Sequence, residues 1–149
     1  MNVGFYHIHL TDDPTIWTAI FLDQMKIIKD YELYYSLDKL HISAITQDDG
    51  RVGIFADLCK TYEMPMTLFF IKNEFATDGE MMNSRDTDKS ISEDVTLKRI
   101  YEYCQQTTTD DNILYFHSKG TTSFFNHLRI GNITKHREYH YWRSFMNWG

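Results

Sequence analysis

Apolar and polar residues alternate along the chain in blocks that predict alternating strands and helices. Four short runs are rich in β-branched and aromatic residues and are bounded by polar or turn-forming residues, which is typical of strands. These runs cover residues 3–8, 40–45, 67–71 and 113–116. The third and fourth runs are almost continuously apolar. We therefore expect the fourth run to be buried on both faces of a sheet, and the third to be either central or covered on both faces.

A helix is predicted after the first strand, because Asp13 can cap it and Pro14 can occupy its first position. Apolar residues then recur at helical spacing as far as Ile28, which predicts that one side of this helix packs on the core. A second, shorter helix is expected over residues 54–62, and Pro65 prevents its continuation.

The third predicted helix follows Ser90 and Glu93, which have the spacing of a capping box. Its apolar positions recur as i, i+3, i+4 and i+7, the pattern of an amphipathic helix. They are Leu97, Ile100, Tyr101 and Cys104. A last helix, rich in aromatic residues, is expected from Thr134 towards the C-terminus.

The alternating order of strands and helices predicts a single α/β domain over residues 1–149. The expected architecture is an open, mostly parallel sheet with helices on both faces, which is Rossmann-like. In the commonest order of this fold, the first and fourth strands are neighbours, and ligands bind beyond their carboxyl ends. Polar residues lie at both of these ends, and we predict that they form one binding site. They are Tyr6, His7 and His9 on the first strand and His117, Ser118 and Lys119 after the fourth.

Charge is unevenly distributed along the chain. The whole chain has a formal net charge of −6, yet the residues from Ile113 onward carry five basic residues and one acidic residue. A basic region on an acidic protein suits a small anionic ligand such as a nucleotide better than a long nucleic acid, so we expect no nucleic-acid partner. The alternative is a chance asymmetry of a solvated surface.

The two cysteines, Cys59 and Cys104, are too few for a disulfide framework, and both fall in helical patterns. We expect reduced thiols in the core.

The N-terminal residues lack a signal-peptide pattern, and no apolar run is long enough to span a bilayer. These features predict a cytoplasmic protein with no membrane span.

Several common motifs are missing from the chain. Neither a dinucleotide-binding glycine pattern nor a phosphate-binding P-loop is present. His136 and His140 are one helical turn apart, but no third metal ligand accompanies them. Asp86 and Asp88 form an Asp-x-Asp sequence in the long polar stretch 72–89, which we interpret as a lid over the site. This Asp-x-Asp does not follow an apolar strand, so we assign no metal ligand, and a divalent cation is not favoured.

Residues 113–120 read Ile-Leu-Tyr-Phe-His-Ser-Lys-Gly, and Trp142, Arg143 and Met146 follow later. This pattern resembles that of small bacterial and viral glycosyltransferase-like proteins. Further matching residues are Phe5-Tyr6-His7-Ile8, Asp23-Gln24 and Glu93 with Thr96-Leu97. The resemblance implies a GT-A type fold that binds a nucleotide-diphospho-sugar and transfers the sugar to an unknown acceptor. The resemblance also implies that the acceptor-binding half into which such proteins continue is lacking here.

The resemblance implies roles for individual residues. The usual Asp-x-Asp after the fourth strand is replaced by His117, Ser118 and Lys119, which would stabilise the diphosphate in place of a metal, together with Arg143. Tyr6 or His7 would contact the base, and Glu93 would contact the sugar. No general base is assigned, so inverting and retaining mechanisms are both open.

Two other classes of function are left open. One is a non-catalytic module that binds a nucleotide or another anion. The other is an interaction protein that a partner chain completes, for instance a homodimer formed through the aromatic C-terminal helix.

Overall fold

The computed structural model describes residues 1–30, 32–46, 48–72 and 93–118. These residues form four strands and four helices. Strands alternate with helices as the sequence predicts, except that a short helix, which was not predicted, lies between the first long helix and the second strand. In chain order they are β1 (Asn2–His9), α1 (Pro14–Asp30), α2 (Leu33–Ser36), β2 (Lys39–Thr46), α3 (Asp49–Cys59), β3 (Met66–Lys72), α5 (Asp94–Gln106) and β4 (Asn112–His117).

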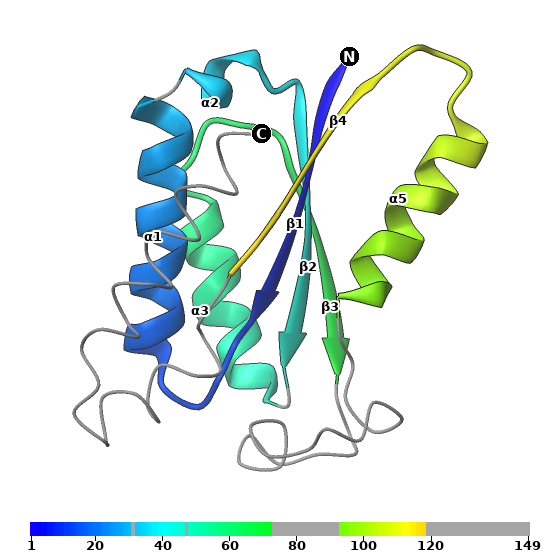
Figure 1. Cartoon of the computed structure of the whole chain (residues 1–149). Coiled ribbons are helices and arrows are strands. Elements are labelled where there is room, and N and C mark those ends of the chain that lie inside the picture. Colours follow the sequence, from blue (N-terminus) through cyan, green and yellow to red (C-terminus); the bar gives the residue numbers. More distant parts are fainter. Residues whose placement is uncertain (31, 47, 73–92, 119–149) are drawn as a thin grey trace, which may run out of the picture.

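The four strands form one parallel sheet in the order β3-β2-β1-β4. Helices α1 and α3 lie on one face of this sheet and α5 lies on the other (Figure 1). The predicted α/β architecture with helices on both faces is therefore confirmed. The predicted pairing is confirmed as well, because Phe116 of β4 lies opposite Tyr6 of β1, and both strands run in the same direction.

The hydrophobic core lies between the sheet and the α1/α3 layer. Strand residues alternate between the two faces of a sheet, and every second residue of β1 and its extension, from Tyr6 to Leu10, points into this core. Trp17 and Phe21 of α1 pack there against Phe55 of α3. The start of α1 agrees with the prediction, because Asp13 Oδ1 accepts a hydrogen bond from the backbone N–H of Thr15 at 2.8 Å.

In the part of the chain that the structure describes, the third strand is not central, and neither it nor the fourth strand is buried on both faces as predicted. Within the described residues β3 and β4 are the two edge strands, and both Phe70 and Ile113 are 36% exposed. Continuous apolar sequence shows that a strand is partly covered, but it does not distinguish an edge from the centre. Cys104 is exposed rather than buried, whereas Cys59 is buried as expected.

Two helices begin at residues other than those predicted. Helix α3 begins at Asp49 rather than at residue 54, because Asp48 caps it by accepting the backbone N–H of Gly50 at 2.7 Å. Helix α5 begins at Asp94, directly after Glu93. Ser90, the other half of the predicted capping box, lies outside the described residues, and Glu93 is itself the residue before the helix, with no side-chain cap hydrogen bond.

Helix α5 is also oriented differently from the expectation for an amphipathic helix. Two residues of its apolar stripe face solvent, with Leu97 50% and Tyr101 65% exposed. The side chains that face the sheet include Thr96, which is fully buried, and Tyr103, whose ring contacts Phe5 of β1. The sheet face under α5 therefore differs chemically from the face under α1.

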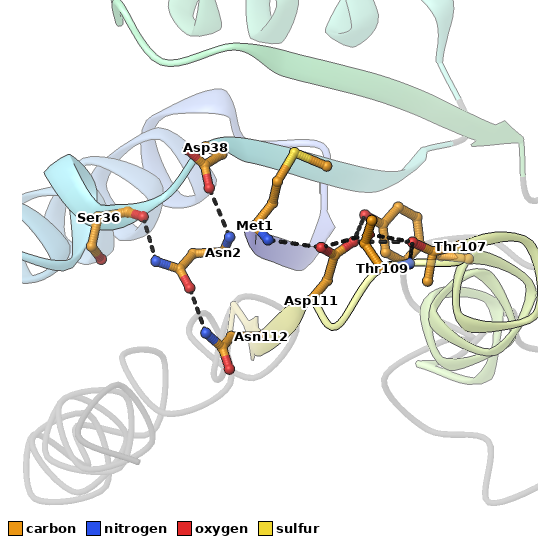
Figure 2. Close-up of polar contacts among 9 residues, drawn as sticks. Met1, Asn2, Ser36, Asp38, Thr107, Thr109, Asp111 and Asn112 are labelled. Atoms are coloured by element: carbon orange, nitrogen blue, oxygen red, sulfur yellow. Dashed lines mark hydrogen bonds and ion pairs between the residues drawn. The ribbon is translucent and has the colours of Figure 1, made fainter.

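At the amino ends of the strands, a network of polar groups joins β1 to its two neighbours (Figure 2). The Met1 ammonium contacts Asp111 at 2.8 Å, and Asn112 Nδ2 donates to Asn2 Oδ1 at 2.8 Å. The backbone N–H of Asn2 donates to Asp38, which precedes β2. Hydrogen bonds from the N-terminus, then from Tyr103 and the nearby threonines, lower the pKa of Asp111. This network holds the three strands in register from the end opposite the predicted site.

Some predicted features lie outside the described residues. These are the lid beyond Lys72, the Asp86 and Asp88 pair, the C-terminal aromatic helix with its proposed homodimer contact, Lys119 and Arg143. Of the helices that the structure describes, none combines the length and apolar character that a membrane crossing needs.

Candidate functional site

The candidate site lies where the sheet changes its winding direction. From β1 the chain proceeds outward to β2 and β3, and then returns to β4 on the other side of β1. In open α/β sheets, the carboxyl ends of the two strands at this switch point flank the ligand crevice. Here those strands are β1 and β4, and their last paired residues are His7 and His117. The structure thus brings together the two polar strand ends that the sequence singled out.

Backbone contacts extend the junction beyond the last pair. The N–H of Ser118 donates to the carbonyl oxygen of His7 at 2.9 Å. The N–H of His9 in turn approaches Ser118 Oγ at 3.4 Å. These contacts fix the first residue after β4 against β1, so Ser118 is buried in the junction rather than displayed on a turn.

His7, which is buried, and His9, which is half-buried, form a pair on the α5 face of β1. Nδ1 of His7 shares a hydrogen bond with Thr96 Oγ1 of α5 at 2.8 Å, and its Nε2 lies 3.2 Å from Nε2 of His9. Two neutral rings satisfy that contact when one nitrogen carries a proton and the other accepts it. Among the described residues, Nδ1 of His9 is buried without a hydrogen-bond partner.

The protonation state of this pair follows from its burial. Desolvation, and then the neighbouring His9 and His117, lowers the pKa of His7 to about 3. Desolvation likewise lowers the pKa of His9 to about 4, although Glu93 acts in the opposite direction. Burial disfavours the charged form of an imidazole. Both rings are therefore neutral at pH 7 and can donate or accept hydrogen bonds, but they supply no positive charge.

His117 has a different partner. Its Nδ1 lies 3.4 Å from Glu93 Oε1, and the hydroxyl of Tyr115 donates to Glu93 Oε2 at 2.9 Å. The rings of Tyr115 and His117 stack with centroids 6.0 Å apart. Burial, followed by the hydrogen bond to Glu93, raises the pKa of Tyr115, so its hydroxyl keeps its proton. The Glu93 carboxylate is thus held between two side chains of β4.

A residue of α1 supports the same strand end from the opposite face. Gln24 is buried, its Nε2 donates to the carbonyl oxygen of His117 at 2.7 Å, and its Oε1 accepts from the hydroxyl of Tyr6. The position of Gln24 carries a sequence signal, because it occupies the core-facing stripe that runs from Trp17 to Ile28. A polar residue in such a stripe needs a buried partner, and Gln24 has two, the hydroxyl of Tyr6 and the carbonyl oxygen of His117.

Tyr6 does not belong to the site. It is fully buried on the α1 face, where its ring stacks on Phe116 and contacts Phe21. Neighbouring residues of a strand point to opposite faces, so Tyr6 and His7 cannot both serve one site on the α5 face. The prediction that Tyr6 contacts a bound base is wrong.

The other predicted site residues have separate outcomes. Five of them lie together at the carboxyl ends of β1 and β4, a place that we call the β1/β4 junction. They are His7, His9, Glu93, His117 and Ser118. Lys119 and Arg143 lie outside the described residues. In the part of the chain that the structure describes, no three His, Cys, Asp or Glu side chains come together as metal ligands.

The sheet order and the polar strand ends define an α/β protein of the Rossmann-like class with a candidate ligand site at its switch point. The model of a family described as a domain of unknown function, DUF8361, matches residues 5–147. The chain therefore belongs to this family. No curated protein and no solved structure matches the chain significantly.

Proposed function

We propose that the protein binds a nucleotide-diphospho-sugar beyond the carboxyl ends of β1 and β4 and transfers the sugar to an acceptor. The observation that carries this proposal is the parallel pairing of β1 with β4, which places His7 beside His117. Nucleotide ligands of open α/β sheets bind at such switch points. The resemblance of residues 113–120 to glycosyltransferase-like proteins indicates the kind of nucleotide.

The transfer itself requires stabilisation of a leaving group. The bond between the anomeric carbon and the diphosphate oxygen breaks, and its electron pair stays on the diphosphate. The acceptor oxygen bonds to the anomeric carbon, and the acceptor hydroxyl proton is released. Fixed positive charges and hydrogen-bond donors near the departing diphosphate lower the barrier. Lys119 directly follows Ser118 in the chain and is a suitable cation for this purpose.

The proposal is tested by the thermal unfolding of the full chain with uridine, guanosine, thymidine and cytidine diphosphates and their sugar conjugates. A ligand that binds only the native state raises the melting temperature. Each ligand is measured with manganese and with a chelator. A shift for one nucleotide family, accompanied by release of free nucleotide from its sugar conjugate, supports the proposal. Binding without any release favours a non-catalytic module, and the absence of every shift contradicts the proposal.

The contribution of Lys119 is measured with Lys119→Ala. A charge-assisted hydrogen bond contributes about 1.5–3 kcal/mol, so we expect about ten-fold weaker binding of the nucleotide in calorimetry. The matched control is Lys60→Ala, which removes an exposed lysine that follows α3. Equal losses of affinity in both variants would show a general charge effect and would contradict a local role of Lys119.

A further inference from the structure

The three histidines of the β1/β4 junction differ in the chemical groups that they contact. His7 and His9 contact each other and a hydroxyl group, whereas Nδ1 of His117 faces the carboxylate of Glu93. Protonating both His7 and His9 would place two N–H donors against each other across 3.2 Å. Protonating His117 places an N–H opposite a carboxylate oxygen. Of the three rings, His117 has the partner that favours a positive charge.

We infer that His117, paired with Glu93, takes up a proton when a nucleoside diphosphate binds and contributes the resulting positive charge to the diphosphate. This inference rests on the proposed function and assigns different roles to its candidate residues. Glu93 becomes the positioning residue of His117 instead of a sugar contact. His7 and His9 stay neutral and contribute hydrogen bonds alone.

The position of Glu93 is fixed from two directions. Its carbonyl oxygen accepts the backbone N–H groups of Thr96 at 2.9 Å and Leu97 at 3.0 Å, which are part of the first turn of α5. Its carboxylate accepts the hydroxyl of Tyr115, which leaves Oε1 directed at His117. An ordered carboxylate fixes the orientation of an imidazole and stabilises its protonated form, as in other His–carboxylate pairs.

The charges around His117 determine when the proton binds. Among the described residues, Glu93 favours protonation of His117, Tyr115 stays neutral, and the nearby His7 and His9 would oppose protonation if they were charged. Burial keeps those two rings neutral at pH 7, so they do not oppose it. A diphosphate adds negative charge next to the ring. The bound state should therefore hold more protons than the free protein near neutral pH.

The inference is tested by calorimetry of the full chain with uridine, guanosine, thymidine and cytidine diphosphates at pH 7.5. Each titration is repeated in HEPES and in Tris, because the difference in heat between these two buffers reports the protons taken up on binding. We expect an uptake of a fraction of a proton. His117→Gln should abolish the uptake and weaken binding about ten-fold. Glu93→Gln should reduce the uptake while the chain keeps its native melting behaviour.

The control is His41→Gln, which removes a histidine stacked between Phe5 and Phe69 on the same face of the sheet. We expect its proton uptake to equal that of the unmodified protein. A readout without ligand is the NMR titration of the His117 ring, whose midpoint should move to lower pH in Glu93→Gln. Tyr115→Phe keeps the stacked ring and removes only the hydroxyl, so it also tests the pair if His117→Gln fails to fold.

The possible outcomes separate the inference from the proposed function. Binding of a nucleoside diphosphate without proton uptake, or with uptake that persists in His117→Gln, overturns the inference and leaves the proposed function standing. An unchanged His117 titration midpoint in Glu93→Gln also overturns it. If none of the four diphosphates binds, the proposed function fails and the inference fails with it.

Discussion

On the face of the sheet covered by α1 and α3, β1 presents Tyr6 and Ile8 to a core of apolar side chains. On the α5 face, the alternating residues of the same strand are Phe5, His7 and His9, and their neighbours include a threonine and a tyrosine of α5. The α1/α3 face is thus packed mainly by the hydrophobic effect, whereas much of the α5 face is held by hydrogen bonds and ring contacts.

This difference separates stability from chemistry within one strand. Apolar burial contributes about 25 cal/mol per Å² and has no directional requirement, so the α1/α3 face can stabilise the fold whatever lies on the other face. Buried imidazoles need partners at fixed distances. The α5 face can therefore hold titratable groups at the switch point, because stability is supplied mainly from the opposite side.

The largest effect on stability is expected from Phe21→Ala. This ring is fully buried and contacts the rings of Tyr6, Phe55 and Tyr62. Its removal should lower the free energy of unfolding by about 4 kcal/mol, since a large cavity is left in the core. Urea unfolding followed by circular dichroism measures the change. A loss below about 1 kcal/mol would mean that the α1/α3 face is not the main source of stability.

The second effect is a loss of stability in mild acid, caused by the α5 face. His7 and His9 bind protons in the unfolded chain near pH 6.5 but resist them in the folded state, with pKa values of about 3 and 4. As the pH falls from 7 to 5, the unfolded chain gains protons that the folded chain does not. The free energy of unfolding should therefore fall by roughly 3–4 kcal/mol.

Urea unfolding at several pH values between 7 and 5 checks this expectation. The double variant His7→Gln with His9→Gln serves as the control, because it removes both titrating groups. Its stability should depend less on pH in this range than that of the unmodified protein. Equal pH dependence in the two proteins would show that the pair titrates normally and is not desolvated.

A smaller effect is expected from Thr96→Val, which keeps the shape of the side chain and removes the hydroxyl that contacts His7 Nδ1. A buried polar atom without its partner costs about 1–3 kcal/mol. The matched control is Thr61→Val, which removes an exposed hydroxyl bonded to the carbonyl oxygen of Leu58. If both variants lower the free energy of unfolding equally, the buried hydrogen bond to His7 contributes no more to stability than an exposed one.

The smallest effect is expected on the outer side of α5. Leu97→Ser and Tyr101→Ser replace half-exposed or largely exposed side chains, and such substitutions change stability by about 0.5 kcal/mol or less. Melting temperatures of the two variants should therefore stay close to that of the unmodified protein. A decrease in melting temperature as large as that caused by Phe21→Ala would show that the apolar stripe of α5 is covered in solution.

Much of the fold was predictable because the hydrophobic periodicity of each segment indicates a strand or a helix, and the order of these elements follows directly from the sequence. The alternation of strands and helices led to the correct parallel pairing of β1 and β4. The orientation of α5 was not predictable, because the rule that apolar stripes face the core assumes an apolar sheet face. Here the sheet face contains His7 and His41, so Thr96 and Tyr103 point inward instead.

The candidate site was predictable from its strand ends but not in its side-chain contacts. Four predicted residues lie at the carboxyl ends of β1 and β4 as expected, namely His7, His9, His117 and Ser118. Tyr6 was assigned wrongly because the assignment did not apply the alternation of strand faces. The pairing of Glu93 with Tyr115 and His117 joins the start of a helix to the end of a distant strand, and no local pattern reports such a contact.

The pairing of β1 with β4 also has a consequence for the order of folding. Asn2 meets Asn112, a separation of 110 residues, whereas β1 and β2 join at Val3 and Lys39. Closing a longer loop costs more chain entropy, and distant contacts slow folding. Strands β1, β2 and β3 can pair through segments that are close in sequence. The junction in which His7 lies beside His117 forms only after β4 has paired with β1. The candidate site is thus made by the most distant strand contact of the described sheet.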